Sequence, residues 1–127
     1  MSGKRNRTAG HNAERDEIKI LKEIGFTEAV SSRAESRTRD DLKVDLCNTG
    51  VLNIQVKTAV QSPNYIELLN QMPDEPDQLN MVAFQKTKKS AQGKFMKKGK
   101  YYIMDADSLY HLLRLTAKYC PEEIGIK

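Results

Sequence analysis

The sequence contains no tryptophan and little aromatic character of any kind, because aromatic residues make up only 6% of its 127 residues. It has only two cysteines, and Cys47 and Cys120 lie too far apart to match the paired spacing of a zinc site. No apolar run is long enough to cross a membrane, and no secretory signal is recognisable. These absences exclude a disulfide scaffold and a zinc finger, and we expect a cytoplasmic protein with reduced thiols and no membrane association.

No glycine-rich phosphate loop, nucleophile elbow or metalloprotease helix occurs in the chain either, which removes several enzyme classes. What the sequence has in quantity is charge: 21 lysines and arginines stand against 17 acidic residues, for a net charge of +4. This balance favours a polyanionic partner such as nucleic acid. The length fits a single domain. We place that domain at residues 10–127, after a flexible basic arm at residues 1–9.

The spacing of apolar residues predicts an α/β protein with the element order α-β-β-β-α-β-β-α. The first helix is expected over residues 10–24, with Asn12 as a possible N-cap. Residues 31–41 are polar and carry three arginines, which is typical of an exposed loop. The other expected elements are strands on both sides of 48–50, a strand over 26–32, a helix over 63–72, strands over 79–86 and 100–104, and a helix over 107–118.

The most informative segment is the alternating stretch over residues 53–59, NIQVKTA. Residues two apart on a strand share a face, so Asn53, Gln55 and Lys57 point one way while the apolar residues between them enter the core. The polar face of this strand therefore carries two amides and an ammonium group, which is unusual for a face that has no binding or catalytic role.

Asp45 is expected beside this polar face, across a turn signal that ends at Gly50. A three-residue loop sets Asp45 opposite Asn53, on the same face, and gives Gly50 the position that favours a positive φ. In this register Asp45, Gln55 and Lys57 lie within about 5 to 8 Å of one another.

The first helix adds a second carboxylate. Projected at about 100° per residue, Ile18, Leu21 and Ile24 define a buried arc, and Glu14 falls inside it. Glu17 lies at the edge of the arc, where water reaches it more easily. A buried carboxylate needs a cation, so we expect Glu14 to meet either a metal ion or an arginine at the edge of the core.

Together these residues form an all-oxygen set suited to Mg²⁺, or to Mn²⁺ as a substitute. The expected ligands are Glu14, Asp45, the side-chain oxygen of Gln55, the carbonyl of Val56, and water. Lys57 is placed to position or activate a water molecule and to stabilise charge that develops on a phosphate. Because glutamine brings no charge, ion binding depends on the two carboxylates and the substrate phosphate.

These residues resemble the PD-(D/E)XK nuclease superfamily, and most closely its Holliday junction resolvases of the archaeal and phage type. The resemblance spans residues 8–113. The early-helix glutamate matches Glu14 within AGHNAER, the aspartate matches Asp45 within KVDL, and the E-x-K motif reads Gln55-Val56-Lys57. It implies a restriction-endonuclease-like fold, with a central mixed β-sheet flanked by helices. It also implies a homodimer that hydrolyses phosphodiesters in branched or four-way DNA with Mg²⁺.

Two positions depart from the family pattern: Val44 replaces the usual proline before the aspartate, and Gln55 replaces the acid of the E-x-K motif. Glutamine occurs at this position in some active members of the superfamily. Asp40 or Asp41 are alternatives to Asp45, although the composition of the loop favours Asp45. A nicking or restriction-type nuclease, a catalytically inactive nucleic-acid-binding protein of the same fold, and an RNA-binding protein remain alternatives.

Several basic and hydroxyl side chains are candidates for DNA contact. The resemblance places a basic residue after the helix glutamate and a serine-bearing loop near the scissile strand, while the loop arginines and a lysine-rich connection add charge. Ordinary solvation is the alternative for both basic segments. The expected DNA-contacting residues are Arg15, Ser31, Ser32, Arg33, Arg37, Arg39, Lys88, Lys89, Lys97 and Lys98.

The last helix carries Leu109, Leu112, Leu113 and Leu115, and we expect these leucines to pack against the rest of the domain. The last helix and the 63–72 segment are the two candidates for a dimer interface.

Overall fold

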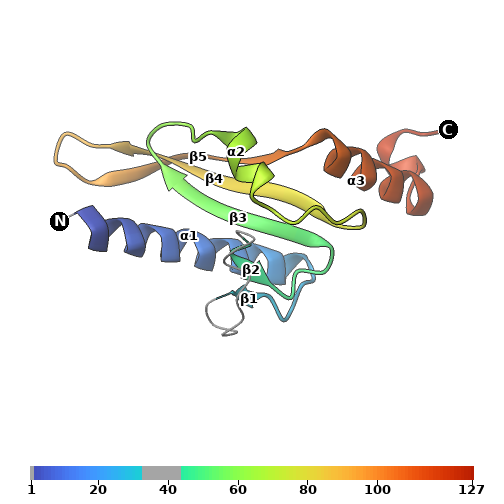
Figure 1. Ribbon diagram of the computed structural model, residues 1–127, viewed down its shortest axis with the longest axis horizontal. Helices are drawn as coiled ribbons and strands as arrows, with labels where there is room; N and C mark the ends of the chain where they lie inside the picture. Colours follow the sequence, from blue (N-terminus) through green and yellow to red (C-terminus); the bar gives the residue numbers. More distant parts are fainter. Residues whose placement is uncertain (1, 33–43) are drawn as a thin grey trace.

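The computed structural model describes residues 2–32 and 44–127, and it shows a mixed α/β fold in which a three-stranded mixed sheet is flanked by helices (Figure 1). The sheet order is β3-β4-β5, and a short antiparallel ladder joins β1 to β2. The elements are α1 (Ser2–Ile24), β1 (Val30–Ser31), β2 (Leu46–Cys47), β3 (Leu52–Ala59), α2 (Tyr65–Asn70), β4 (Leu79–Lys89), β5 (Phe95–Met104), α3 (Ala106–Tyr119) and a final 3-10 turn (Glu122–Ile124).

The predicted order of the elements is confirmed, and several predicted boundaries are wrong. Helix α1 already begins at Ser2, so its first turns occupy the segment expected to be an arm, and Asn12 lies within the helix rather than at its N-cap. The second helix begins only at Tyr65, because the side chain of Asn64 accepts a hydrogen bond from the Glu67 N–H and caps it. Arg33, Arg37, Arg39, Asp40 and Asp41 lie outside the described residues.

The sheet combines one parallel and one antiparallel pairing. Strand β3 runs parallel to β4, with Ile54 beside Met81 and Lys57 beside Phe84, and helix α2 belongs to the crossover between them. Strand β4 then turns back into β5 as a long antiparallel hairpin, well beyond the 79–86 and 100–104 strands expected from the sequence. Helices α1 and α2 lie on opposite faces of this sheet (Figure 1).

The main core lies between α1 and the sheet. Leu21 of α1 packs with Ile54 of β3, Met81 and Ala83 of β4, and Leu46 of β2. Leu52 and Val56 border the same cluster, so the predicted inward face of β3 is confirmed. The polar residues of β3 therefore face the other side of the sheet, toward the crossover that contains α2.

Fewer apolar residues of α1 and α3 are buried than the sequence suggests. Ile24, expected in the buried arc of α1, is 69% exposed. In α3 the predicted packing role of the leucines is wrong for Leu109, Leu112 and Leu113, which are all classed as exposed. Within the described ranges, no helix is long and apolar enough to cross a membrane.

Candidate active site at the edge of β3

Asp45 lies at the open edge of β3 and contacts that strand through both its backbone and its side chain. Its N–H donates to the carbonyl of Ile54 at 2.9 Å, and its Oδ2 accepts from the N–H of Val56 at 2.6 Å. The carbonyl of Asp45 accepts from the N–H of Ser32 at 2.8 Å, which ties β1 to the same place. The β1–β2 ladder is a separate small sheet, and the hydrogen bonds of Asp45 link it to the edge of β3.

The predicted hairpin register is wrong, because Asp45 meets the Ile54–Val56 segment rather than Asn53. Instead of pairing with β3, strand β2 forms its ladder with β1. The side chain of Asn48 contributes to this choice, since it donates to the carbonyl of Glu28, before β1. The predicted positive φ at Gly50 is confirmed at 60°. The shift carries Asp45 closer to Gln55 and Lys57 along the strand than the predicted register did.

Val56 presents its carbonyl to the same edge. A strand residue directs its N–H and its C=O to the same side, and the N–H of Val56 points to Asp45. The carbonyl of Val56 is therefore directed away from β4 and toward Asp45. Two of the predicted metal ligands, a carboxylate and a backbone carbonyl, lie together at this edge.

Gln55 is the most unusual residue of the strand. It is only 3% exposed, and its Oε1 atom is buried without a hydrogen-bond partner among the described residues. By contrast, Asn53 on the same face is satisfied, because its amide donates to the side chain of Asn80 at 2.8 Å. An orphaned buried amide oxygen costs free energy unless something donates to it or it coordinates a cation.

Lys57 lies on the same face as Gln55 and is half-buried. Its cross-strand neighbour is Phe84, whose ring stacks on Tyr101 and meets the edge of Tyr65. This aromatic wall beside Lys57 limits the access of water on one side. Tyr65 is part of this wall through its edge contact with Phe84.

Glu14 lies on the α1 side of the sheet and lines a pocket of about 210 Å³ with His11, Arg15, Ile18 and Ser31. Ser31 is the cross-strand partner of Leu46, which is next to Asp45 in the chain. The structure thus brings Asp45 and the backbone of Val56 together at the edge of β3 and places Glu14 beside β1, on the α1 side of the sheet. The side chain of Gln55 lies on the opposite face of the sheet.

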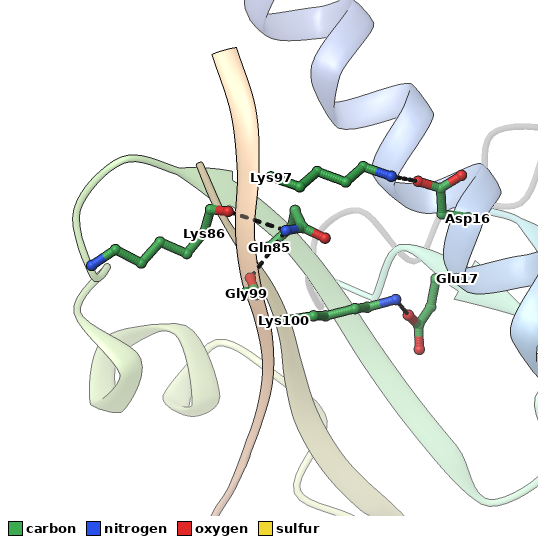
Figure 2. A network of polar contacts seen from close by, with 7 residues as sticks. All are labelled: Asp16, Glu17, Gln85, Lys86, Lys97, Gly99 and Lys100. Carbon is green, nitrogen blue, oxygen red and sulfur yellow. Dashed lines mark hydrogen bonds and ion pairs between the residues drawn. The ribbon is translucent and has the colours of Figure 1, made fainter. Parts of the chain in front are cut away.

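The expected burial of the two helix carboxylates is reversed. Glu14 is half-buried, whereas Glu17, expected to be near the rim, is only 1% exposed. A cation does compensate the buried carboxylate, and it is Lys100 of β5, which forms an ion pair with Glu17 (Figure 2). The sequence held a signal for this, because at about 100° per residue Glu17 falls between Leu21 and Ile24.

Tyr102 completes the Glu17 cluster. Its hydroxyl donates to Glu17 Oε1, and the ammonium of Lys100 lies 5.7 Å from the centre of its ring. Burial first, and then the hydrogen bond and charge of Glu17, raise the pKa of Tyr102 above its ordinary value. The Glu17–Lys100–Tyr102 cluster fastens β5 to α1, and we assign it no part in catalysis.

The two serines predicted to contact DNA differ. Ser32 is 3% exposed, and its hydroxyl donates to the carbonyl of Val44 at 2.7 Å and accepts from the thiol of Cys47. Its hydroxyl is thus engaged inside the protein, which removes Ser32 from the DNA-contacting set. Ser31 is half-buried beside the Glu14 pocket. Cys47 and Cys120 are both free thiols.

Among the predicted basic contacts, Arg15 is exposed at the Glu14 pocket, and Lys88, Lys89, Lys97 and Lys98 are exposed on the β4–β5 hairpin. Lys97 forms a surface ion pair with Asp16 at 2.7 Å (Figure 2). Lys88, Lys89 and Lys98 lie in the outer part of the β4–β5 hairpin, which extends to one end of the molecule (Figure 1).

Comparisons with protein-family models, with curated proteins and with solved structures find no match to this chain. In the part of the chain that the structure describes, no three histidine, cysteine, aspartate or glutamate side chains gather into a metal-binding group. The predicted set contains only two carboxylates, and its remaining donors are an amide and a backbone carbonyl.

Proposed function

We propose that this protein is a metal-dependent DNA endonuclease of the restriction-endonuclease-like fold, acting on branched DNA as a Holliday junction resolvase does. The observation that carries the proposal is the contact between Asp45 Oδ2 and the Val56 N–H. This contact joins Asp45 to the strand that carries Gln55 and Lys57. The nuclease motif requires an aspartate next to a strand with a glutamate or glutamine and, two residues later, a lysine.

The residues at this edge fit Mg²⁺, with Mn²⁺ as a substitute. Asp45 and the carbonyl of Val56 are hard oxygen donors at the edge itself. The orphaned Oε1 of Gln55 lies on one face of the sheet and Glu14 on the other, so both side chains would have to turn toward the edge to complete the proposed set. A bound divalent ion would supply Lewis acidity and a more acidic water molecule. The single carboxylate at the strand edge predicts weak ion binding in the absence of substrate, because the phosphate must provide the missing charge.

Hydrolysis adds water across one phosphorus–oxygen bond, giving a phosphate monoester and a hydroxyl group. In the proposed reaction Asp45 helps to orient the water molecule that attacks the phosphorus. The hydrogen bond from the Val56 N–H fixes the position of Asp45. Lys57 stabilises the negative charge that grows on the phosphate oxygens. The buried Phe84 ring beside Lys57 lowers the local polarity, which strengthens this attraction.

We also propose that the protein acts as a homodimer joined through α3. Two symmetric incisions in a four-way junction are made most simply by a twofold pair of sites. Leu109, Leu112 and Leu113 form an exposed apolar stripe on α3. In a twofold pair the stripe of one copy would cover the same stripe of the other, because such an interface is made by the same patch on both subunits.

A catalytically inactive DNA-binding protein of the same fold is the second candidate, and Gln55 is the observation that favours it. Without the charge of a glutamate the site could keep its shape and its affinity for phosphate while losing its ion. The remaining alternatives, a nicking or restriction-type nuclease, differ in the DNA that they select rather than in the site.

The test is incubation of the purified protein with a labelled four-way junction and a matched linear duplex, in Mg²⁺, in Mn²⁺ and in chelator. We expect incision of the junction in either metal, little incision of the duplex, and none in chelator. Tight junction binding in chelator without cutting in either metal would establish the inactive binder instead. Equal cutting of duplex and junction would favour a restriction-type nuclease.

A further inference from the structure

The outer part of the β4–β5 hairpin carries a concentration of charge that the proposed catalytic site does not use. No acidic residue occurs between Leu79 and Met104, whereas seven lysines do. Lys97 and Lys100 point to α1 and pair with its carboxylates, while Lys86 points away (Figure 2). Within the described residues no carboxylate pairs with the ammonium groups of the other five, Lys86, Lys88, Lys89, Lys94 and Lys98.

The same hairpin exposes two large apolar side chains next to this charge. Phe95 is 46% exposed and Met96 is 48% exposed. The cross-strand partner of Phe95 is Lys89, and that of Met96 is Lys88. Because cross-strand partners share a face and successive residues alternate, each face of the hairpin presents one apolar side chain beside a lysine.

The hairpin is held in place rather than loosely attached. The Gln85 amide donates to the carbonyls of Lys86 and Gly99, at 3.1 and 3.0 Å, where a β-bulge interrupts the ladder (Figure 2). The Asp16–Lys97 ion pair adds a link to α1. At the turn, Gly93 has a φ of 81°, which favours glycine. The exposed side chains are therefore presented in a preorganised ribbon, which reduces the entropy cost of binding.

We propose that this hairpin inserts between the strands of DNA at a branch point. Phe95 and Met96 contact unstacked bases, and the neighbouring lysines contact phosphates. A two-stranded ribbon fits a nucleic-acid groove, aromatic side chains stack on exposed bases, and apolar side chains act as wedges between base steps. The inference rests on the proposal that DNA is the substrate, but it does not depend on cleavage.

The placement of the two apolar residues distinguishes DNA from a lipid surface. A membrane is flat and meets one face of a ribbon, so it would favour apolar side chains gathered on that face. Phe95 and Met96 project from opposite faces, each with its own lysine. A ribbon that is contacted on both faces at once suits the opening between two arms of a branched DNA.

The lysine half of the proposal is tested by binding in chelator, where no cleavage occurs. The double variant Lys88→Gln/Lys89→Gln is compared with Lys19→Gln/Lys22→Gln, which removes two exposed lysines from α1. Fluorescence anisotropy with a labelled four-way junction, measured at several salt concentrations, gives the slope of log affinity against log salt. We expect the hairpin variant to lower this slope by about two and the α1 variant to leave it nearly unchanged. Equal effects of the two variants would overturn the proposal.

The apolar half is tested by Phe95→Ala on the junction and on a matched duplex. We expect affinity for the junction to fall about tenfold and affinity for the duplex to stay within a factor of two, because only the junction offers unstacked bases. Phe95→Tyr keeps the ring and should keep the affinity. A 2-aminopurine base at the branch point should change fluorescence on binding of the wild type and not of Phe95→Ala. Equal losses on junction and duplex would contradict base contact.

The outcomes separate this inference from the proposed function. Junction binding that depends on Phe95, without any metal-dependent cutting, would support the proposed role of the hairpin and contradict the proposed nuclease activity. Metal-dependent cutting that is indifferent to the hairpin variants would do the reverse. Binding to vesicles of anionic lipid, lost in Lys88→Gln/Lys89→Gln and accompanied by no DNA binding, would overturn the DNA partner.

Discussion

At the scale of single residues, Gln55 decides how the site is interpreted. Its buried oxygen has no partner among the described residues, and it stands where the resemblance expects an acid. If a divalent ion occupies this position, a carboxylate there should bind the ion more tightly than an amide does. If no ion binds, the same carboxylate would be an unpaired buried charge.

The substitution Gln55→Glu tests this through the melting temperature, measured with and without metal. In chelator, the substitution should lower the melting temperature by about 5 °C or more, because it buries a charge. Mg²⁺ or Mn²⁺ should restore most of this loss and should raise the wild-type value far less. Thermal unfolding followed by circular dichroism measures both effects, with Gln61→Glu at an exposed position as the control. A melting temperature of the variant that ignores metal would argue against a cation site at Gln55.

At the scale of elements, the ion pair between Glu17 and Lys100 joins α1 to β5. Lys100→Met should lower the free energy of unfolding by about 3 kcal/mol, because it leaves a buried carboxylate without its cation. Urea unfolding measures the change. Lys98→Met, at an exposed position two residues away, should stay within about 0.5 kcal/mol of the wild type.

The double variant Glu17→Gln/Lys100→Met separates pairing from packing. It should recover part of the loss, since no buried charge remains. If the double variant is less stable than Lys100→Met alone, the ion pair is not what holds β5 against α1.

The same elements show what the sequence can and cannot predict. The alternation in β3 correctly predicted which residues face the core, because side chains of a strand alternate regardless of its partners. The partner of β2 was not predictable in this way, because alternation does not say which distant segment a strand meets, and β2 pairs with Val30 and Ser31 of β1. Glu14 and Glu17 both fall inside the apolar arc of α1, so the helix alone does not say which is buried. The groups that meet Glu17, Lys100 and Tyr102, come from far along the chain.

At the scale of the whole molecule, α3 exposes more apolar surface than an isolated domain needs. The periodicity of its leucines correctly predicted an amphipathic helix, but periodicity alone cannot distinguish a face that packs in its own domain from one that meets a second copy. Ser108 is the buried residue of this helix, and its hydroxyl accepts from the Asn80 N–H.

Leu112→Asp should convert the proposed dimer to a monomer, as measured by size-exclusion chromatography with light scattering. Ile66→Asp, at an exposed apolar position on α2, should leave the oligomeric state unchanged. A wild-type protein that is monomeric at micromolar concentration would contradict the α3 interface.

The most direct measurement of the central claim is single-turnover cleavage of a labelled four-way junction in Mg²⁺ by Asp45→Asn and by Asp16→Asn. Asparagine keeps an oxygen that can accept from the Val56 N–H, so Asp45→Asn removes charge with little change of structure. We predict that Asp45→Asn lowers the cleavage rate at least about 100-fold while junction affinity in chelator is retained. Asp16→Asn, on the surface of α1, should cut at nearly the wild-type rate. Undiminished cleavage by Asp45→Asn would show that hydrolysis takes place somewhere other than the edge of β3.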